Sequence, residues 1–198
     1  MEKHNPEEVI GSAQKALILL KEGNERYVLG QLSDKTHYAD ERKLLRTKQN
    51  PFAIVLTCAD SRTPPEIFFD QELGDLFVIR NAGNVCDPIT LGSMEYAVEH
   101  LGTRLVVICG HTNCGAVRAA LTDSNLPKNI QIIADYIKPA IALGGDIEQI
   151  TKNNVEEMVR IASNDSILRH SEIMIVGALY NVKTGVVTWL RKHRLHHE

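Results

Sequence analysis

Two short motifs carry residue types that bind transition metals. One is CADSR at residues 58–62, and the other is HTNC at residues 111–114. The thiolates of Cys58 and Cys114, with the imidazole of His111, form a natural ligand set for zinc, which takes four tetrahedral ligands. The spacing of His111 and Cys114 lets both reach one ion from a single turn, and a helix N-terminus at Cys114 would favour its thiolate form. The sequence therefore predicts three zinc ligands.

The fourth ligand position decides what such a zinc ion can do. Asp60 lies two residues after Cys58, close enough to bind the metal itself and close the site. Arg62 lies two residues further on and can hold the same carboxylate in a bidentate ion pair. The fourth position is then left to water, as a hydrolytic or hydrating zinc requires. Both arrangements of Asp60 remain open at this point.

Four uninterrupted apolar runs have the length of strands. They cover residues 52–57, 76–80, 105–109 and 173–178, and such runs are typical of parallel sheets that are buried on both faces. Helical patterns lie between them, at residues 64–70, 91–101, 114–121 and, as one long stretch, 127–169. This alternation predicts an α/β fold with a mainly parallel central sheet and flanking helices. A turn at residues 182–185 returns residues 186–190 as an antiparallel edge strand.

The N-terminal part is predicted to be a helical arm. A helix begins at residues 5–8, Gly23 breaks it, and short helices follow at residues 24–29 and 41–48. Beyond the arm, Cys58 directly follows the first strand and His111 follows the third. Open α/β sheets bind ligands at the carboxyl ends of their strands, so both motifs are expected there.

The 198-residue chain has the composition of one globular domain. Hydrophobic residues make up 43%, charged residues 24%, and the formal net charge is -3. This balance gives no support for nucleic-acid binding, and no run approaches the ~20 apolar residues of a membrane span. We expect a single domain over residues 1–198, with the arm at 1–48 and a zinc-binding core at 52–198. The charged N-terminus lacks a signal-peptide core, so a cytoplasmic protein with four reduced cysteines is expected.

The motifs resemble those of the β-class carbonic anhydrases, whose pattern is Cys-x-Asp-x-Arg followed by His-x-x-Cys. The resemblance extends through residues 20–27, 77–84 and 95–98 and covers nearly the whole chain. It implies a β-carbonic anhydrase fold with one Zn2+ per subunit. The implied reaction is the reversible hydration of carbon dioxide to bicarbonate and a proton through zinc-bound hydroxide. Asp60, held by Arg62, would accept the hydroxide proton and orient the nucleophile.

The resemblance also implies a substrate pocket of the plant-like subclass. Gln49 would donate a hydrogen bond to a substrate oxygen, Phe77 and Tyr96 would form apolar walls, and Gly115 matches just after the last ligand. These walls are expected to come from across a dimer interface, which implies a homodimer or a dimer of dimers. Ala82 departs from the pattern, because a valine is frequent there, and it should widen the pocket.

Two other functions remain open on the sequence alone. Relatives of this fold hydrolyse carbon disulfide or carbonyl sulfide, although the pocket residues Gln49 and Phe77 argue against that activity. A non-catalytic, zinc-stapled structural protein is the second alternative. A preserved Asp60–Arg62 pair argues against it, because a purely structural metal site needs no removable fourth ligand.

Overall fold

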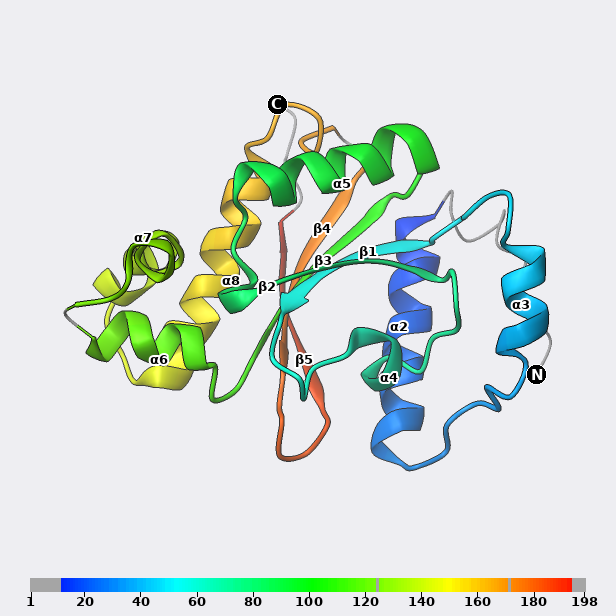
Figure 1. The fold of residues 1–198 in the computed structure, drawn as a ribbon, viewed down its shortest axis with the longest axis horizontal. Helices are drawn as coiled ribbons and strands as arrows, with labels where there is room; N and C mark the ends of the chain where they lie inside the picture. Colours follow the sequence, from blue (N-terminus) through cyan, green and yellow to red (C-terminus); the bar gives the residue numbers. More distant parts are fainter. Residues whose placement is uncertain (1–11, 124, 171, 194–198) are drawn as a thin grey trace.

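The computed structural model describes residues 12–123, 125–170 and 172–193 and contains a five-stranded sheet with flanking helices (Figure 1). The strands follow the order β2-β1-β3-β4-β5. Their bounds are β1 Ala53–Cys58, β2 Leu76–Asn81, β3 Leu105–His111, β4 Met174–Tyr180 and β5 Val187–His193. The first four strands are parallel to one another, and β5 runs antiparallel to β4. The predicted α/β fold with an antiparallel edge strand is therefore confirmed.

The helices lie on both sides of this sheet. On one side are α2 Ala13–Val28, α3 Tyr38–Leu44 and α4 Pro65–Phe68, and on the other are α5 Pro88–Leu101, α6 Gly115–Thr122, α7 Lys128–Ala142 and α8 Ile147–Ser163 (Figure 1). A short 3-10 helix, η1 Ala82–Asn84, follows β2. Among the described residues, no helix combines the length and apolar character needed to cross a bilayer.

Strand side chains alternate between two apolar cores, one on each face of the sheet. Ile54 packs with Met158 of α8 in one core. Its neighbour Val55 packs with Leu17 of α2 and Phe68 of α4 in the other. All six residues of β1 are buried. Burial on both faces explains why the strand sequences are continuous apolar runs rather than alternating ones.

The parallel register brings the two motifs to one edge of the sheet. Ile54 of β1 lies opposite Val106 of β3, and Thr57 lies opposite Cys109. Because the two strands run in the same direction, Cys58 at the end of β1 and His111 at the end of β3 meet at their carboxyl edge.

The predicted helix break at Gly23 is wrong. Helix α2 runs from Ala13 to Val28 without interruption, with Ser12 as its N-cap. Gly23 is needed for packing: a Cβ atom there would lie 1.8 Å from the carbonyl oxygen of Phe69. Tertiary contact, which single-sequence propensity does not contain, overrides the usual effect of glycine. The helix start predicted at residues 5–8 lies outside the described residues.

The long helical stretch predicted at residues 127–169 is two helices, α7 and α8. Gly144 and Gly145 separate them with φ values of 76° and 107°. These left-handed values suit glycine and end a helix. The Asp146 side chain then accepts a hydrogen bond from the Gln149 amide and caps α8. The helix predicted at residues 41–48 lies slightly earlier, as α3.

Candidate metal centre

Three buried side chains meet at the carboxyl edge of β1 and β3. Cys58 is the last residue of β1, His111 the last of β3, and Cys114 the N-cap of α6. Asn113, with a φ of 58°, makes the turn that carries the chain from His111 to Cys114. The potential ligand atoms of Cys58, His111 and Cys114 all lie within 4.8 Å of one another. The structure thus brings together the three ligands that the spacing predicted.

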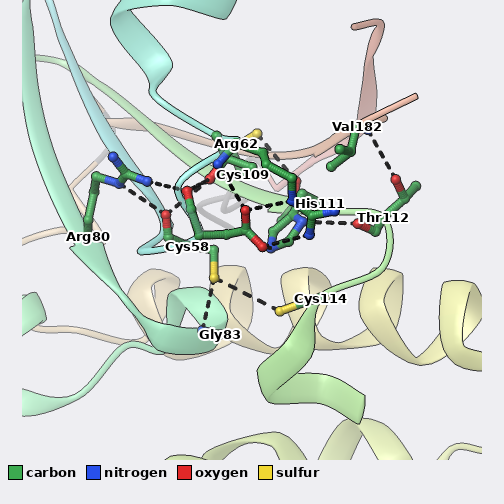
Figure 2. Close-up of polar contacts among 12 residues, drawn as sticks. Cys58, Arg62, Arg80, Gly83, Cys109, His111, Thr112, Cys114 and Val182 are labelled. Carbon is green, nitrogen blue, oxygen red and sulfur yellow. Dashed lines mark hydrogen bonds and ion pairs between the residues drawn. The ribbon is translucent and has the colours of Figure 1, made fainter. Parts of the chain in front are cut away.

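The geometry of this cluster fits a zinc ion. The Sγ atoms of Cys58 and Cys114 are 4.0 Å apart and face each other (Figure 2). Two zinc–sulfur bonds at a tetrahedral angle would place them about 3.8 Å apart. The Nδ1 atom of His111 lies 3.0 Å from the Thr112 carbonyl oxygen, whereas its buried Nε2 has no hydrogen-bond partner. An Nδ1–H donating to that carbonyl leaves the Nε2 lone pair for a metal.

Asp60 is held by Arg62 beside the three ligands. Nε and the backbone amide of Arg62 each donate to Oδ1 of Asp60 at 2.9 Å, and a terminal guanidinium nitrogen donates to Oδ2 at 2.7 Å. Oδ2 is also 3.9 Å from Nε2 of His111. Of the two arrangements left open by the sequence, the structure therefore contains the bidentate pair, with the carboxylate next to the candidate metal position.

Charge at the site is controlled by hydrogen bonds. The Arg62 side chain holds the pKa of Asp60 well below its usual value, so this carboxylate stays ionised. A hydrogen bond from the Cys114 thiol lowers the pKa of Cys58 to about 4, against the opposing effect of burial. The pKa of Cys114 is raised in turn by its hydrogen bond to Cys58. A divalent cation between the sulfurs would favour both thiolates.

Two residues that the sequence reasoning did not single out fix the turn between Cys58 and Arg62. The Nε of Arg80 donates to the Cys58 carbonyl oxygen at 3.0 Å, and a terminal nitrogen donates to the carbonyl of Asp60 (Figure 2). The Thr63 hydroxyl donates toward the same two carbonyls, at 3.1 and 3.0 Å. Arg80 lies in the stretch of residues 77–84 that carries the family resemblance, and this was the available signal.

The predicted substrate-pocket residues do not gather around the metal cluster of their own chain. Gln49 precedes β1, whereas Cys58 ends it, and six strand residues correspond to a rise of about 20 Å. Phe77 and Tyr96 lie together, with ring centroids 6.3 Å apart, but Phe77 pairs with Ile54 near the amino end of β1. Tyr96 is 48% exposed. Only Gly115, directly after Cys114, adjoins the ligands.

An apolar cavity of about 190 Å3 lies between η1 and helices α6 and α7. Ala82 lines it together with Ala116, Ile133 and other apolar residues. The small side chain of Ala82 therefore borders this cavity, and its effect on the substrate pocket stays a prediction.

These features define an α/β protein with a buried Cys-His-Cys cluster that could hold a metal ion and an aspartate–arginine pair beside it. A family model described as "Carbonic anhydrase" matches residues 53–187, which include every residue of this centre. The chain belongs to the β-carbonic anhydrase family.

Individual relatives agree with this assignment. The chain is 39% identical over 188 residues to "Carbonic anhydrase 2" of Mycobacterium tuberculosis, with 88% of this chain and 90% of that protein covered. A Coccomyxa β-carbonic anhydrase, solved in complex with acetazolamide, superposes with a TM-score of 0.72 at 25% identity, covering 87% of this chain and 86% of that one. A tetrameric β-carbonic anhydrase from Sordaria macrospora gives 0.69 at 26% identity, covering 78% and 86%.

Proposed function

We propose that this chain is a zinc-dependent carbonic anhydrase that catalyses the reversible hydration of carbon dioxide to bicarbonate and a proton. The observation that carries the proposal is the juxtaposition of two kinds of group. A buried triangle of metal-ligand atoms lies next to a carboxylate that is already occupied by an arginine. Three protein ligands with the fourth position left open are the mark of a catalytic zinc site rather than a structural one.

Cys58, His111 and Cys114 would hold one Zn2+ per chain. When bound, this ion supplies a nucleophile near neutral pH by lowering the pKa of water in the fourth position. The chain shields the site from competing protons and solvent, because all three ligand residues are buried. The Thr112 carbonyl keeps the His111 ring in the tautomer that presents Nε2.

Asp60 and Arg62 are the proposed catalytic pair. The ionised Asp60 carboxylate accepts a hydrogen bond from the attacking water and so directs its lone pair at the carbon atom of carbon dioxide. Arg62 occupies both carboxylate oxygens, which keeps Asp60 from becoming a metal ligand and keeps it ionised. The backbone bonds from Arg80 and Thr63 hold this turn in place.

The apolar part of the pocket is proposed to come from a second copy of the chain. Gln49, Phe77 and Tyr96 are remote from their own metal cluster, and Phe77 and Tyr96 are only partly buried. In a dimer they would face the cluster of the other subunit, with Gln49 donating to a substrate oxygen and the two rings excluding water. Gly115 would leave room for the substrate. A homodimer is thus the smallest complete enzyme, and a dimer of dimers is compatible with it.

We propose that residues 1–198 form one carbonic anhydrase domain, with a helical arm at 1–48 and a zinc-binding core at 52–198. A cytoplasmic location is supported by the four cysteines, all of which are free thiols.

A stopped-flow assay of carbon dioxide hydration, with zinc content measured on the same sample, tests the proposal. We expect one zinc per chain and turnover far above the uncatalysed rate. Protein that holds stoichiometric zinc but does not accelerate hydration would support a structural metal instead. The same sample assayed with carbon disulfide or carbonyl sulfide would identify the alternative hydrolase.

A further inference from the structure

One metal-ligand sulfur accepts a hydrogen bond from a loop on the far side of the site. The backbone amide of Gly83 donates to Sγ of Cys58 at 3.4 Å (Figure 2). Gly83 and Asn84, in η1, have φ values of 77° and 46°. Glycine adopts such values freely, but a non-glycine residue such as Asn84 keeps them only when its surroundings impose them. The loop that presents the amide to Cys58 therefore needs an external support.

Asn154, in the middle of α8, supplies that support. Its side-chain nitrogen donates to the Gly83 carbonyl oxygen at 3.0 Å, a contact between residues 71 positions apart in the sequence. The side chain is buried, with 1% of the residue exposed. Asn154 thus holds the carbonyl of the same glycine whose amide contacts the metal-ligand sulfur.

The stability of the fold alone does not explain an asparagine at this position. The Oδ1 atom of Asn154 is buried and accepts no hydrogen bond from the described residues. An unsatisfied buried acceptor of this kind costs about 1–3 kcal/mol. Several buried neighbours of Asn154 on α8, including Val155, Met158 and Ala162, are apolar, although Thr151 is not. A buried amide whose oxygen has no partner and whose nitrogen bonds only to Gly83 points to a role in holding that loop.

We propose that Asn154 is a positioning residue for the Cys58 thiolate, acting through Gly83. By fixing the Gly83 carbonyl, it keeps the adjacent amide aimed at Sγ. A hydrogen bond donated to a metal-bound thiolate delocalises its charge and orients its lone pair toward the ion. Mutation of a residue that hydrogen-bonds to a metal ligand typically lowers metal affinity 10–100-fold. The inference rests on the proposed function, because it requires a metal at this site.

The adjacent Asn153 provides a matched control. It lies on the same helix, is also buried, and its amide donates to the carbonyl oxygens of Ala140 and Gly144 at 3.4 and 3.3 Å. These contacts join α8 to the end of α7 and do not reach the metal cluster. Its Oδ1 also accepts a hydrogen bond from Gln149. Replacing Asn153 therefore removes at least as many side-chain hydrogen bonds from the same helix as replacing Asn154, without disturbing Gly83.

The test compares the zinc affinities of Asn154→Leu, Asn154→Ser and Asn153→Leu with that of the wild type, by competition with a chromophoric chelator. Leucine keeps the branched shape of the Asn154 side chain without its polar atoms. Serine keeps a polar group but is too short to reach Gly83, so a folded protein of either kind tests the inference. In cobalt-substituted protein, the sulfur-to-metal charge-transfer band reports the thiolate directly. In the wild type loaded with an NMR-active cadmium isotope, a scalar coupling between the metal and the Gly83 amide proton reports the hydrogen bond.

We expect the zinc dissociation constant to rise about 10–100-fold in the Asn154 variants, with a shifted charge-transfer band, and to change less than about threefold in Asn153→Leu. Equal zinc affinities of the Asn154 variants and Asn153→Leu would overturn the inference. So would the absence of a coupling between cadmium and the Gly83 amide proton in the wild type. In both cases wild-type zinc binding and hydration would stand. A wild type that binds no zinc would instead overturn the proposed function.

Discussion

At the scale of single residues, the central feature is the pairing of both carboxylate oxygens of Asp60 with Arg62. Arg62 binds both of them, although Oδ2 lies only 3.9 Å from the ligand atom of His111. The carboxylate is therefore close enough to the metal position to act on a water there while being held away from the metal. Arg62 has a structural task in this arrangement and an electrostatic one, because it also keeps the pKa of Asp60 low.

Asp60→Asn and Arg62→Ala should both lower kcat/KM for carbon dioxide hydration by at least about 100-fold, the usual range for a lost proton acceptor. Zinc content should largely survive, because neither residue is among the three buried ligands. Stopped-flow hydration and metal analysis on the same preparations measure both quantities. Near-normal turnover in both variants would show that the pair has no catalytic role.

Cys58→Ser should lose zinc, because a hydroxyl replaces one of two thiolates in the cluster. Cys109→Ala is the matched control. Cys109 is a fully buried thiol of the neighbouring strand β3, and burial raises its pKa to about 12, so it is inert. That variant should retain full zinc content despite some loss of stability. Atomic absorption of the purified proteins distinguishes the two, and equal zinc in both would remove Cys58 from the ligand set.

At the scale of elements, Asp70 ties helix α2 to the segment that follows the turn of residues 58–62. It comes just after α4, is buried, and pairs with Arg26 of α2 and with Lys35 at 3.0 Å. Ser33 adds hydrogen bonds from its amide and hydroxyl. Burial alone would raise the pKa of Asp70, but these hydrogen bonds together lower it.

Asp70→Asn should cost about 3 kcal/mol of unfolding free energy at neutral pH, because it leaves two cations without their shared anion. A carboxyl whose pKa is lowered on folding contributes its full stabilisation of the fold above its unfolded pKa of 3.8. That stabilisation is lost as the pH falls through the lower pKa of the folded state. The difference between wild type and variant should therefore be constant near neutrality and narrow below about pH 4. Denaturant unfolding across this range measures it. Asp135→Asn, which breaks an exposed pair with Lys138, should change little at any pH.

The elements show why some of the fold could be predicted from the sequence and some could not. The strands were predicted within a few residues because burial on both faces makes their apolar runs continuous. The break at Gly23 was wrong because a contact with Phe69, 46 positions away, explains that glycine. The ligands Cys58, His111 and Cys114 were visible from spacing and strand ends. Asn154 was not, because its role arises from a contact 71 positions away and leaves no local pattern.

At the scale of the whole molecule, β2 is the outer strand of the sheet beside β1, and it is only partly buried. Phe77, on this strand, and Tyr96, on α5, lie next to each other and remain partly open to solvent. The single chain therefore presents aromatic side chains at an outer edge and a metal cluster that lacks them. Pairing of two copies would satisfy both.

Two inactive variants should restore activity when mixed. Cys58→Ser loses the metal but keeps Gln49 and both aromatic walls. A Gln49→Ala/Phe77→Ala chain keeps the metal cluster but lacks the Gln49 amide and one of the two walls. After subunit exchange, half of the dimers are mixed and each has one complete site, so recovery should approach about a quarter of wild-type activity. Mixing Cys58→Ser with His111→Ala is the control and should recover nothing. No recovery in the first mixture would place the whole pocket within one chain.

The register of β1 and β3 has a consequence for the lifetime of the protein. It brings Cys58 and Cys114, which are 56 positions apart in the chain, close enough for one bound metal ion to join them. By analogy with a disulfide, closing a loop of that length is worth about 4 kcal/mol, and metal binding energy adds to folding energy directly. Chelation should therefore accelerate digestion by a protease as well as stop hydration. Zinc supply would then determine how much of this enzyme a cell keeps, in addition to how much of it is active.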